Sequence, residues 1–116
     1  ALLAKGVTGD PTSISAEQAI KMATINGAKA LGLSAKIGSL EVGKHADFCI
    51  IECNHLNTSP IYNVASSLVY STNSAQVSDV YVHGQCLLQN KQLLSLDETS
   101  LMQQAKDWQI KISQAH

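Results

Sequence analysis

The side chains that could bind a metal ion are few and scattered in this sequence. Its four histidines are His45, His55, His83 and His116, and no His-x-His or His-Glu-x-x-His pair is present. A hydrolytic metal site needs several imidazoles or carboxylates that converge on one ion, and such ligands commonly come in pairs on one strand or helix. We therefore expect His45 and His55 to be solvated loop residues and His83 to face outward. His116, the last residue, is expected to be disordered. The sequence predicts no metal ligand in this chain.

Nucleophilic and acid–base chemistry is also poorly supported. No Gly-x-Ser-x-Gly sequence is present, and three cysteines lie in or beside apolar stretches, where a thiol is usually inert: Cys49, Cys53 and Cys86. Cys49 and Cys53 are four residues apart in an expected strand, or about 13 Å, which is too far for a disulfide. Reduced, buried thiols are expected. Asp47 is interpreted as a structural residue whose carboxylate bonds turn amides. No catalytic residue is predicted.

Composition limits the class of protein. Of the 116 residues, 45% are hydrophobic and 15% charged, as in globular domains, and the formal net charge of −1 is spread without blocks. A nucleic acid or an anionic membrane is therefore not expected as a partner. No glycine-rich loop precedes a helix, so no cofactor-binding residue is predicted. No apolar window approaches the length of about 20 residues that a membrane helix needs. Ala1 is neither an initiator Met nor the start of a recognisable leader, so we expect the chain to begin inside a longer gene. The expected reduced cysteines indicate a cytoplasmic protein.

A helix is predicted over Ala16–Leu31. Ser15 and Gln18 have the spacing of a capping box at its start. The packing face of this helix carries small residues, Ala23 and Gly27, which allow the backbone of a neighbour to approach closely. We therefore expect another element to press on that face.

Short strands are predicted to follow this helix. They comprise an extended piece between two glycine turns, an apolar strand covered on both faces, a weaker strand and an alternating strand: Ile37–Lys44, Ala46–Ile51, Leu68–Tyr70 and Asp79–Gly84. Glu52–Asn63 is predicted to be a polar loop. Strands over 85–89 and 92–94 are expected to pair as a hairpin around Asn90–Lys91.

A closing helix is predicted to end near Ser113. Ser95 and Glu98 have the spacing of a second capping box, and apolar residues recur on one face of the helix that follows. Trp108 is the largest of these residues. The helix is therefore expected to dock on the rest of the chain through Trp108.

Two stretches are more specific than these patterns. They are Met22–Leu33, MATINGAKALGL, and Ile37–Phe48, IGSLEVGKHADF. In order and spacing they resemble the end of amidohydrolase-superfamily sequences, where an A-T-x-N-G-A-x-A-L-G helix precedes an I-G-S-L-E-x-G-K-x-A-D turn and strand. The downstream segment, with Val80–Gly84 and the Trp108 helix, is most similar to methylthioadenosine/S-adenosylhomocysteine deaminases, with triazine-type chlorohydrolases nearby. The resemblance covers almost the whole chain.

The resemblance implies an α+β fold that is part of a larger enzyme. In that family a TIM barrel is joined to a composite β-sandwich. Residues 1–33 would be the helical end of the barrel, residues 34–96 half of the small sandwich, and residues 97–116 a C-terminal helix. The family's metal ligands, two His in a His-x-His, two further His and an Asp, would all lie upstream of Ala1. The resemblance thereby implies zinc or another divalent metal for the whole enzyme. It implies a hydrolase that acts on C–N bonds other than peptide bonds. The reaction would be the deamination, or in the chlorohydrolases the dechlorination, of an amidine-like ring carbon.

Three hypotheses about function follow. The first is a non-catalytic C-terminal fragment of such an enzyme, whose partners are the missing N-terminal part and further copies of itself that cover its open faces. The second is a self-contained, non-enzymatic β-module for binding or assembly. The third is a small independent enzyme that uses His83 or Cys86. The family order of the motifs favours the first.

Overall fold

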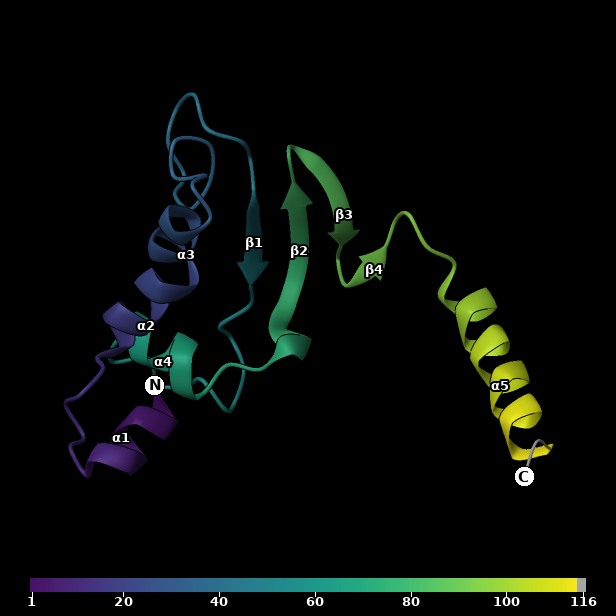
Figure 1. The fold of residues 1–116 in the computed structure, drawn as a ribbon, viewed down its shortest axis with the longest axis horizontal. Helices are drawn as coiled ribbons and strands as arrows, with labels where there is room; N and C mark the ends of the chain where they lie inside the picture. The colour runs from purple at the N-terminus through teal and green to yellow at the C-terminus, as the bar shows by residue number, and fades with distance from the viewer. Residues whose placement is uncertain (115–116) are drawn as a thin grey trace.

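A computed structural model describes residues 1–114 of the chain (Figure 1). Its elements are α1 (Leu2–Thr8), α2 (Ala16–Ala23), α3 (Ile25–Ala30), β1 (Phe48–Ile51), α4 (Val64–Tyr70), the 3-10 turn η1 (Ser74–Gln76), β2 (Val77–Val82), β3 (Gln85–Gln89), β4 (Gln92–Leu93) and α5 (Glu98–Gln114). The strands form one antiparallel sheet in the order β1-β2-β3-β4. The expected mixture of helices and an antiparallel sheet is therefore confirmed.

The helix predicted over Ala16–Leu31 is in fact two helices. Its start is as expected, because the Gln18 backbone N–H donates to Ser15 Oγ at 3.2 Å and the Ser15 N–H donates to Gln18 Oε1 at 2.8 Å. The break falls at Thr24, with φ −119° and ψ −98°. The Thr24 hydroxyl donates to the Ile20 carbonyl at 2.7 Å, a side-chain bond of the kind that bends helices. The prediction of one continuous helix was wrong.

The segment predicted as extended, Ile37–Lys44, is a series of turns and contains no strand. The two glycine turns themselves are present, because Gly38 and Gly43 both have φ +93°. Polar groups inside the loop bond one another: Lys44 Nζ donates to Ser39 Oγ at 2.6 Å and lies 3.3 Å from Glu41 Oε1. These local bonds replace the partner strand that an extended conformation would need.

Strand β1 is an edge strand whose apolar residues remain accessible. Cys49 is exposed, and the Ile50 side chain is 47% exposed. The prediction that this strand is covered on both faces is therefore wrong for the part of the chain that the structure describes. A nearly continuous apolar strand is typical of a sheet that is covered on both faces. Residues 1–114 do not supply a layer that covers both faces of β1.

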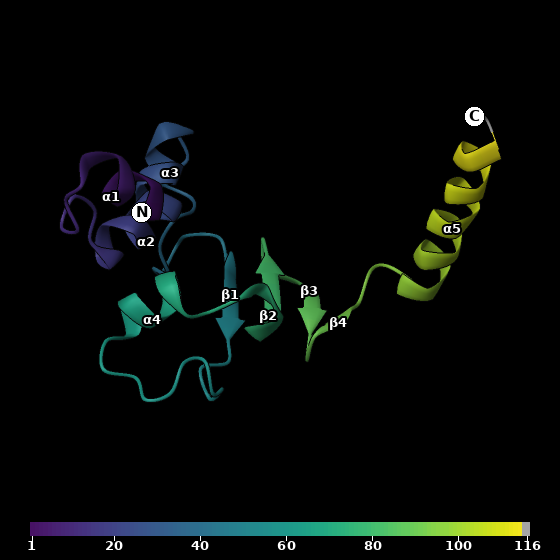
Figure 2. The same ribbon diagram turned by 90° about the horizontal axis from the view of Figure 1, so that it is seen from below.

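The weak strand predicted at Leu68–Tyr70 is the end of helix α4. Asn63 caps this helix, since its Oδ1 accepts a hydrogen bond from the Ser66 N–H at 2.7 Å. A run of three apolar residues is too short to distinguish the two periodicities, and the N-cap was the missed signal. Helix α4 packs against α2, so that α1 to α4 gather on one side of β1 (Figure 2).

The hairpin predicted around Asn90–Lys91 is confirmed, whereas the strand predicted over Asp79–Gly84 ends at Val82 and its last two residues form a second turn. His83 and Gly84, with φ 52° and 77°, connect β2 to β3, while Asn90 and Lys91, with φ 49° and 66°, connect β3 to β4. Positive φ at both central residues is the type I′ arrangement, whose twist matches that of the flanking strands.

Helix α5 lies away from the other elements beyond β4 (Figures 1 and 2). Asp97 rather than Ser95 caps it, because Asp97 Oδ1 accepts from the N–H groups of Thr99 and Ser100 at 3.0 and 3.2 Å. No residue of α5 is buried, and Trp108 is 62% exposed. The prediction that Trp108 docks this helix on the rest of the chain is thus wrong for residues 1–114.

The chain buries much less surface than a compact domain of its length. Its buried hydrophobic residues, within the described part, are Ala16 and Ala28. The accessible area is 8739 Å², against about 6,100 Å² for a typical folded monomer of this mass. The radius of gyration is 18.7 Å, compared with about 13 Å for a compact domain of this length. An excess of about 2,600 Å² is the size of a substantial protein interface. No helix in residues 1–114 has the length and apolar character needed to cross a membrane.

Candidate functional site

An apolar groove separates helices α2 and α3 from strands β1 and β2. Its volume is about 600 Å³, and its walls include Ala23, Gly27, Leu31, Phe48 and Tyr81. The Phe48 and Tyr81 rings stack across the two strands at 4.6 Å between centroids. The small-residue stripe of Ala23 and Gly27 therefore faces open space, where the sequence analysis expected a neighbouring element.

Two ionisable groups in the groove have close partners elsewhere in the sheet. The neighbouring Cys86 side chain, through a hydrogen bond and its charge, holds the pKa of Tyr81 above its usual value. The Asp47 carboxylate is hydrogen-bonded, since its Oδ1 accepts from the backbone N–H of His83. The carbonyl of Ala46 also accepts from the Gly84 N–H at 3.0 Å. Asp47 joins the start of β1 to the β2–β3 turn, as the structural interpretation of this residue predicted.

The structure brings together two histidines that the sequence analysis treated as independent. His45 Nδ1 and His83 Nδ1 are 3.0 Å apart, and the rings meet edge to face with centroids at 4.2 Å. His83 is exposed, as predicted, whereas His45 is half-buried. The pairing of Phe48 with Tyr81 across β1 and β2 places the residues before β1 beside those after β2. That register was the missing signal, because 38 positions separate the two histidines.

The remaining candidates stay apart. His55 lies near Glu52, with Nε2 3.4 Å from Oε2, and His116 falls outside the described residues. All three cysteines are free, but Cys49 is exposed, contrary to the expectation of buried thiols. Among residues 1–114, no three His, Cys, Asp or Glu side chains converge so that they could hold a metal ion.

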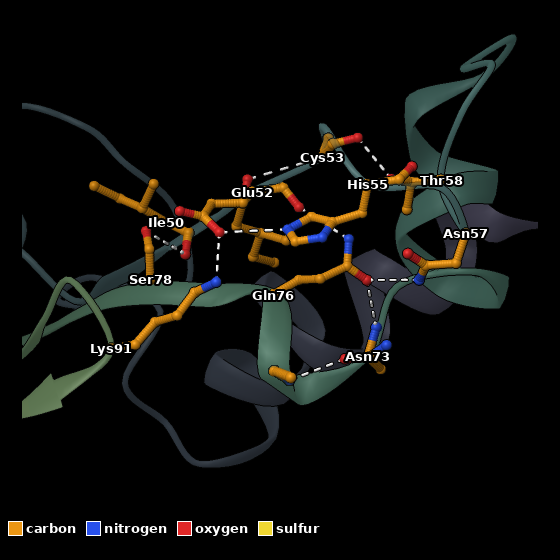
Figure 3. Close-up of polar contacts among 12 residues, drawn as sticks. Ile50, Glu52, Cys53, His55, Asn57, Thr58, Asn73, Gln76, Ser78 and Lys91 are labelled. Atoms are coloured by element: carbon orange, nitrogen blue, oxygen red, sulfur yellow. Dashed lines mark hydrogen bonds and ion pairs between the residues drawn. The ribbon is translucent and has the colours of Figure 1, made fainter.

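A buried glutamine organises the polar loop between β1 and α4 (Figure 3). Gln76 is 2% exposed, and its Oε1 accepts from Asn57 Nδ2 at 2.8 Å and from the Asn73 N–H at 3.1 Å. Its Nε2 donates to the Glu52 carbonyl at 2.9 Å. Every side-chain polar atom of Gln76 is therefore bonded, and Thr58, 3% exposed, similarly bonds the Cys53 carbonyl at 2.6 Å. A fully satisfied network of this kind fixes a loop conformation.

Glu52 connects this loop to the second hairpin. Its Oε2 lies 2.6 Å from Lys91 Nζ (Figure 3). Lys91, and next His55, hold the pKa of Glu52 below its usual value. The pair is solvent-exposed, so its contribution to stability is small. We interpret this network as structural.

Comparison with known proteins gives the family. The model of the amidohydrolase family matches residues 1–87, and the chain belongs to this family. A 5-methylthioadenosine/S-adenosylhomocysteine deaminase of Teredinibacter turnerae is 44% identical over 97% of this chain and 25% of its own length. One of Halalkalibacterium halodurans is 50% identical over 90% of this chain and 24% of its own. The chain thus spans about a quarter of the curated relatives that it matches.

Solved structures of similar fold include a deaminase and a chlorohydrolase. An adenosine deaminase from Xanthomonas campestris with bound zinc superposes with a TM-score of 0.92 at 37% identity, over 97% of this chain and 26% of that one. An atrazine chlorohydrolase from Arthrobacter aurescens, complexed with zinc, gives 0.73 at 26% identity, over 81% and 20%. The predicted resemblance to deaminases and triazine hydrolases is confirmed. Zinc is bound in both neighbours, whereas no three His, Cys, Asp or Glu side chains converge within residues 1–114 of this chain.

Proposed function

We propose that this chain is the C-terminal part of a metal-dependent amidohydrolase that hydrolytically deaminates an adenosine-type nucleoside. The observation that carries the proposal is 44% identity over 97% of the chain with a 5-methylthioadenosine/S-adenosylhomocysteine deaminase, a quarter of which it spans. A triazine-type substrate that loses chloride is the second choice, because the chlorohydrolase is 26% identical. Both leaving groups sit on an amidine-like ring carbon, so the two reactions are chemically related.

The proposed role of the chain is structural. Residues 1–33 would complete the helical end of a barrel, residues 34–96 would form part of a β-sandwich, and residues 97–116 would be a C-terminal helix. The open groove beside Ala23 and Gly27, the accessible face of β1 and the exposed helix α5 support this division. Each is an apolar surface that needs a covering layer, and the excess exposed area matches a large interface.

The metal of the proposed enzyme would be held by residues outside this segment. Asp47 is bonded to the backbone of His83, and His45 and His83 supply two imidazoles, which is fewer than a catalytic zinc takes from protein. The residues of this chain would instead shape and support the neighbouring parts of the enzyme. Gln76 and Asn57 would do so by fixing the loop that follows β1.

The test is an assay of the whole protein that contains this chain. Ammonia release is measured from 5-methylthioadenosine, S-adenosylhomocysteine and adenosine, and chloride release from atrazine, before and after removal of metal with a chelator. Metal-dependent ammonia release from a nucleoside is the expected result. Absence of turnover with all four compounds would overturn the proposed reaction. Turnover by the 116-residue chain alone would overturn the placement of the catalytic groups elsewhere.

We further propose that the 116-residue chain, when separated from the rest, associates with itself through its uncovered faces. Exposed large apolar side chains occur in β1, in α5 and in the segment between them, including Ile50, Leu56 and Trp108. Sedimentation velocity at micromolar concentration measures this association. A monomer throughout that range would contradict the proposal.

A further inference from the structure

We propose that His45 and His83 form a chelating site for one divalent transition-metal ion of the Ni²⁺, Cu²⁺ or Zn²⁺ type. The inference rests on side chains of this chain alone and is independent of the proposed function. Neutral imidazole is the protein ligand that these three ions share. The two Nδ1 atoms lie 3.0 Å apart, and His83 is exposed, so that water can occupy the remaining coordination positions.

The separation of the two nitrogens fits neighbouring positions on one ion. With metal–nitrogen bonds of about 2.0–2.1 Å, a distance of 3.0 Å corresponds to an N–metal–N angle of about 94°. Angles near 90° are those of the tetragonal geometry that Cu²⁺ and Ni²⁺ prefer. A head-on N–H···N bond at the same distance would hold the ring centres about 5 Å apart. The centres are 4.2 Å apart with the ring planes at 87°, so the rings meet edge to face and the two nitrogens do not point directly at each other.

Hydrogen bonds fix the backbone at both histidines before any ion binds. The His45 N–H donates to the Lys36 carbonyl at 2.8 Å, and the His83 N–H donates to Asp47 Oδ1. The Gly84 N–H donates to the Ala46 carbonyl at 3.0 Å, which joins the residues that directly follow the two histidines. Little ordering is therefore needed on binding. The Asp47 carboxylate also places a negative charge at this end of the sheet, which favours a cation.

A histidine outside the proposed site, His55, provides a comparison. His55 Nε2 is 3.4 Å from Glu52 Oε2, but the same oxygen is 2.6 Å from Lys91 Nζ. An ammonium group at that position already neutralises the carboxylate and repels a metal ion. His55 is half-buried, like His45, and therefore serves as a control for a histidine without a chelating neighbour.

Nickel binding by the 116-residue chain tests the inference. Isothermal titration with NiCl₂ compares the wild type with His45→Asn, His83→Asn and the control His55→Asn. His83→Asn is the decisive variant, because Asn accepts a positive φ and Asn-Gly is a preferred type I′ turn, so the hairpin is retained. Far-UV circular dichroism verifies that each variant keeps the wild-type fold.

We expect the wild type and His55→Asn to bind one equivalent of Ni²⁺ with equal affinity. Both His45→Asn and His83→Asn should bind at least tenfold more weakly. Nickel should also raise the thermal midpoint of the wild type and leave that of His83→Asn unchanged. Equal affinities for the wild type and His83→Asn, or absence of nickel binding by the wild type, would overturn the inference.

Discussion

Replacement of Gly38 by alanine should destabilise the fold far more than the same change at Gly43. The two glycines share φ +93°, so each alanine variant carries a comparable backbone strain of about 1–3 kcal/mol. A Cβ at Gly43 meets nothing within 4 Å. A Cβ at Gly38 would lie 2.7 Å from the Ala28 Cβ, 3.1 Å from the Ile25 Cα and 3.2 Å from the Thr24 carbonyl oxygen. Two of these three atoms are backbone, which cannot move away cheaply.

The difference between the two variants isolates the steric effect from the strain. Forcing a methyl group into a packed contact costs a further about 1–3 kcal/mol, so Gly38→Ala should lose that much more than Gly43→Ala. Urea unfolding followed by circular dichroism measures the difference, which corresponds to a midpoint shift of about 1 M at the slopes of small proteins. Complete loss of the fold in Gly38→Ala alone agrees with the same reasoning. Equal midpoints for the two variants would show that α3 does not press on this turn.

Three other perturbations should have defined outcomes. Gln76→Leu leaves the Asn73 N–H and the Glu52 carbonyl without a partner, and at about 1–2 kcal/mol for each group it should lower the free energy of unfolding in urea by about 2–4 kcal/mol. The control Gln92→Leu changes an exposed glutamine and should cost little. Equal losses for the two variants would refute the role of the network. Because Lys91 lowers the folded-state pKa of Glu52, its stabilisation exists above about pH 4.5 and is lost as the pH falls through the lower folded value. Glu52→Gln should therefore flatten the acid side of the stability profile, and an unchanged profile would contradict the pairing. Trp108→Asp should weaken self-association in sedimentation without changing the helical content, because this side chain is 62% exposed; unaltered association would exclude α5 from the contact.

The elements that sequence reasoning located correctly are those fixed by neighbouring residues. The β3–β4 hairpin follows from Asn90, which tolerates positive φ, and the start of α2 follows from the Ser15–Gln18 capping box. Both devices act within four residues of the chain. The alternation over residues 79–84 located β2 but not its bounds, because β2 begins at Val77 and His83 and Gly84 form the turn that follows it.

Most of the incorrect predictions depend on distant parts of the structure or on competing local bonds. The break at Thr24 comes with a side-chain bond to Ile20 that a helical pattern does not reveal. The apolar β1 sequence and the Trp108 face predicted contacts that residues 1–114 do not make. The His45–His83 pair needed the β1–β2 register, which a sequence pattern alone leaves undetermined.

The two type I′ turns have a consequence for the order in which this sheet assembles. Strands β2, β3 and β4 are joined by two-residue connections, whereas β1 reaches β2 only through residues 52–76. Closing the long connection costs about 2 kcal/mol more chain entropy than closing either turn. We therefore expect the meander from Val77 to Leu93 to form first and β1 to pair with it later. Slow steps in folding should then correspond to the addition of β1 and its attached helices rather than to formation of the hairpins.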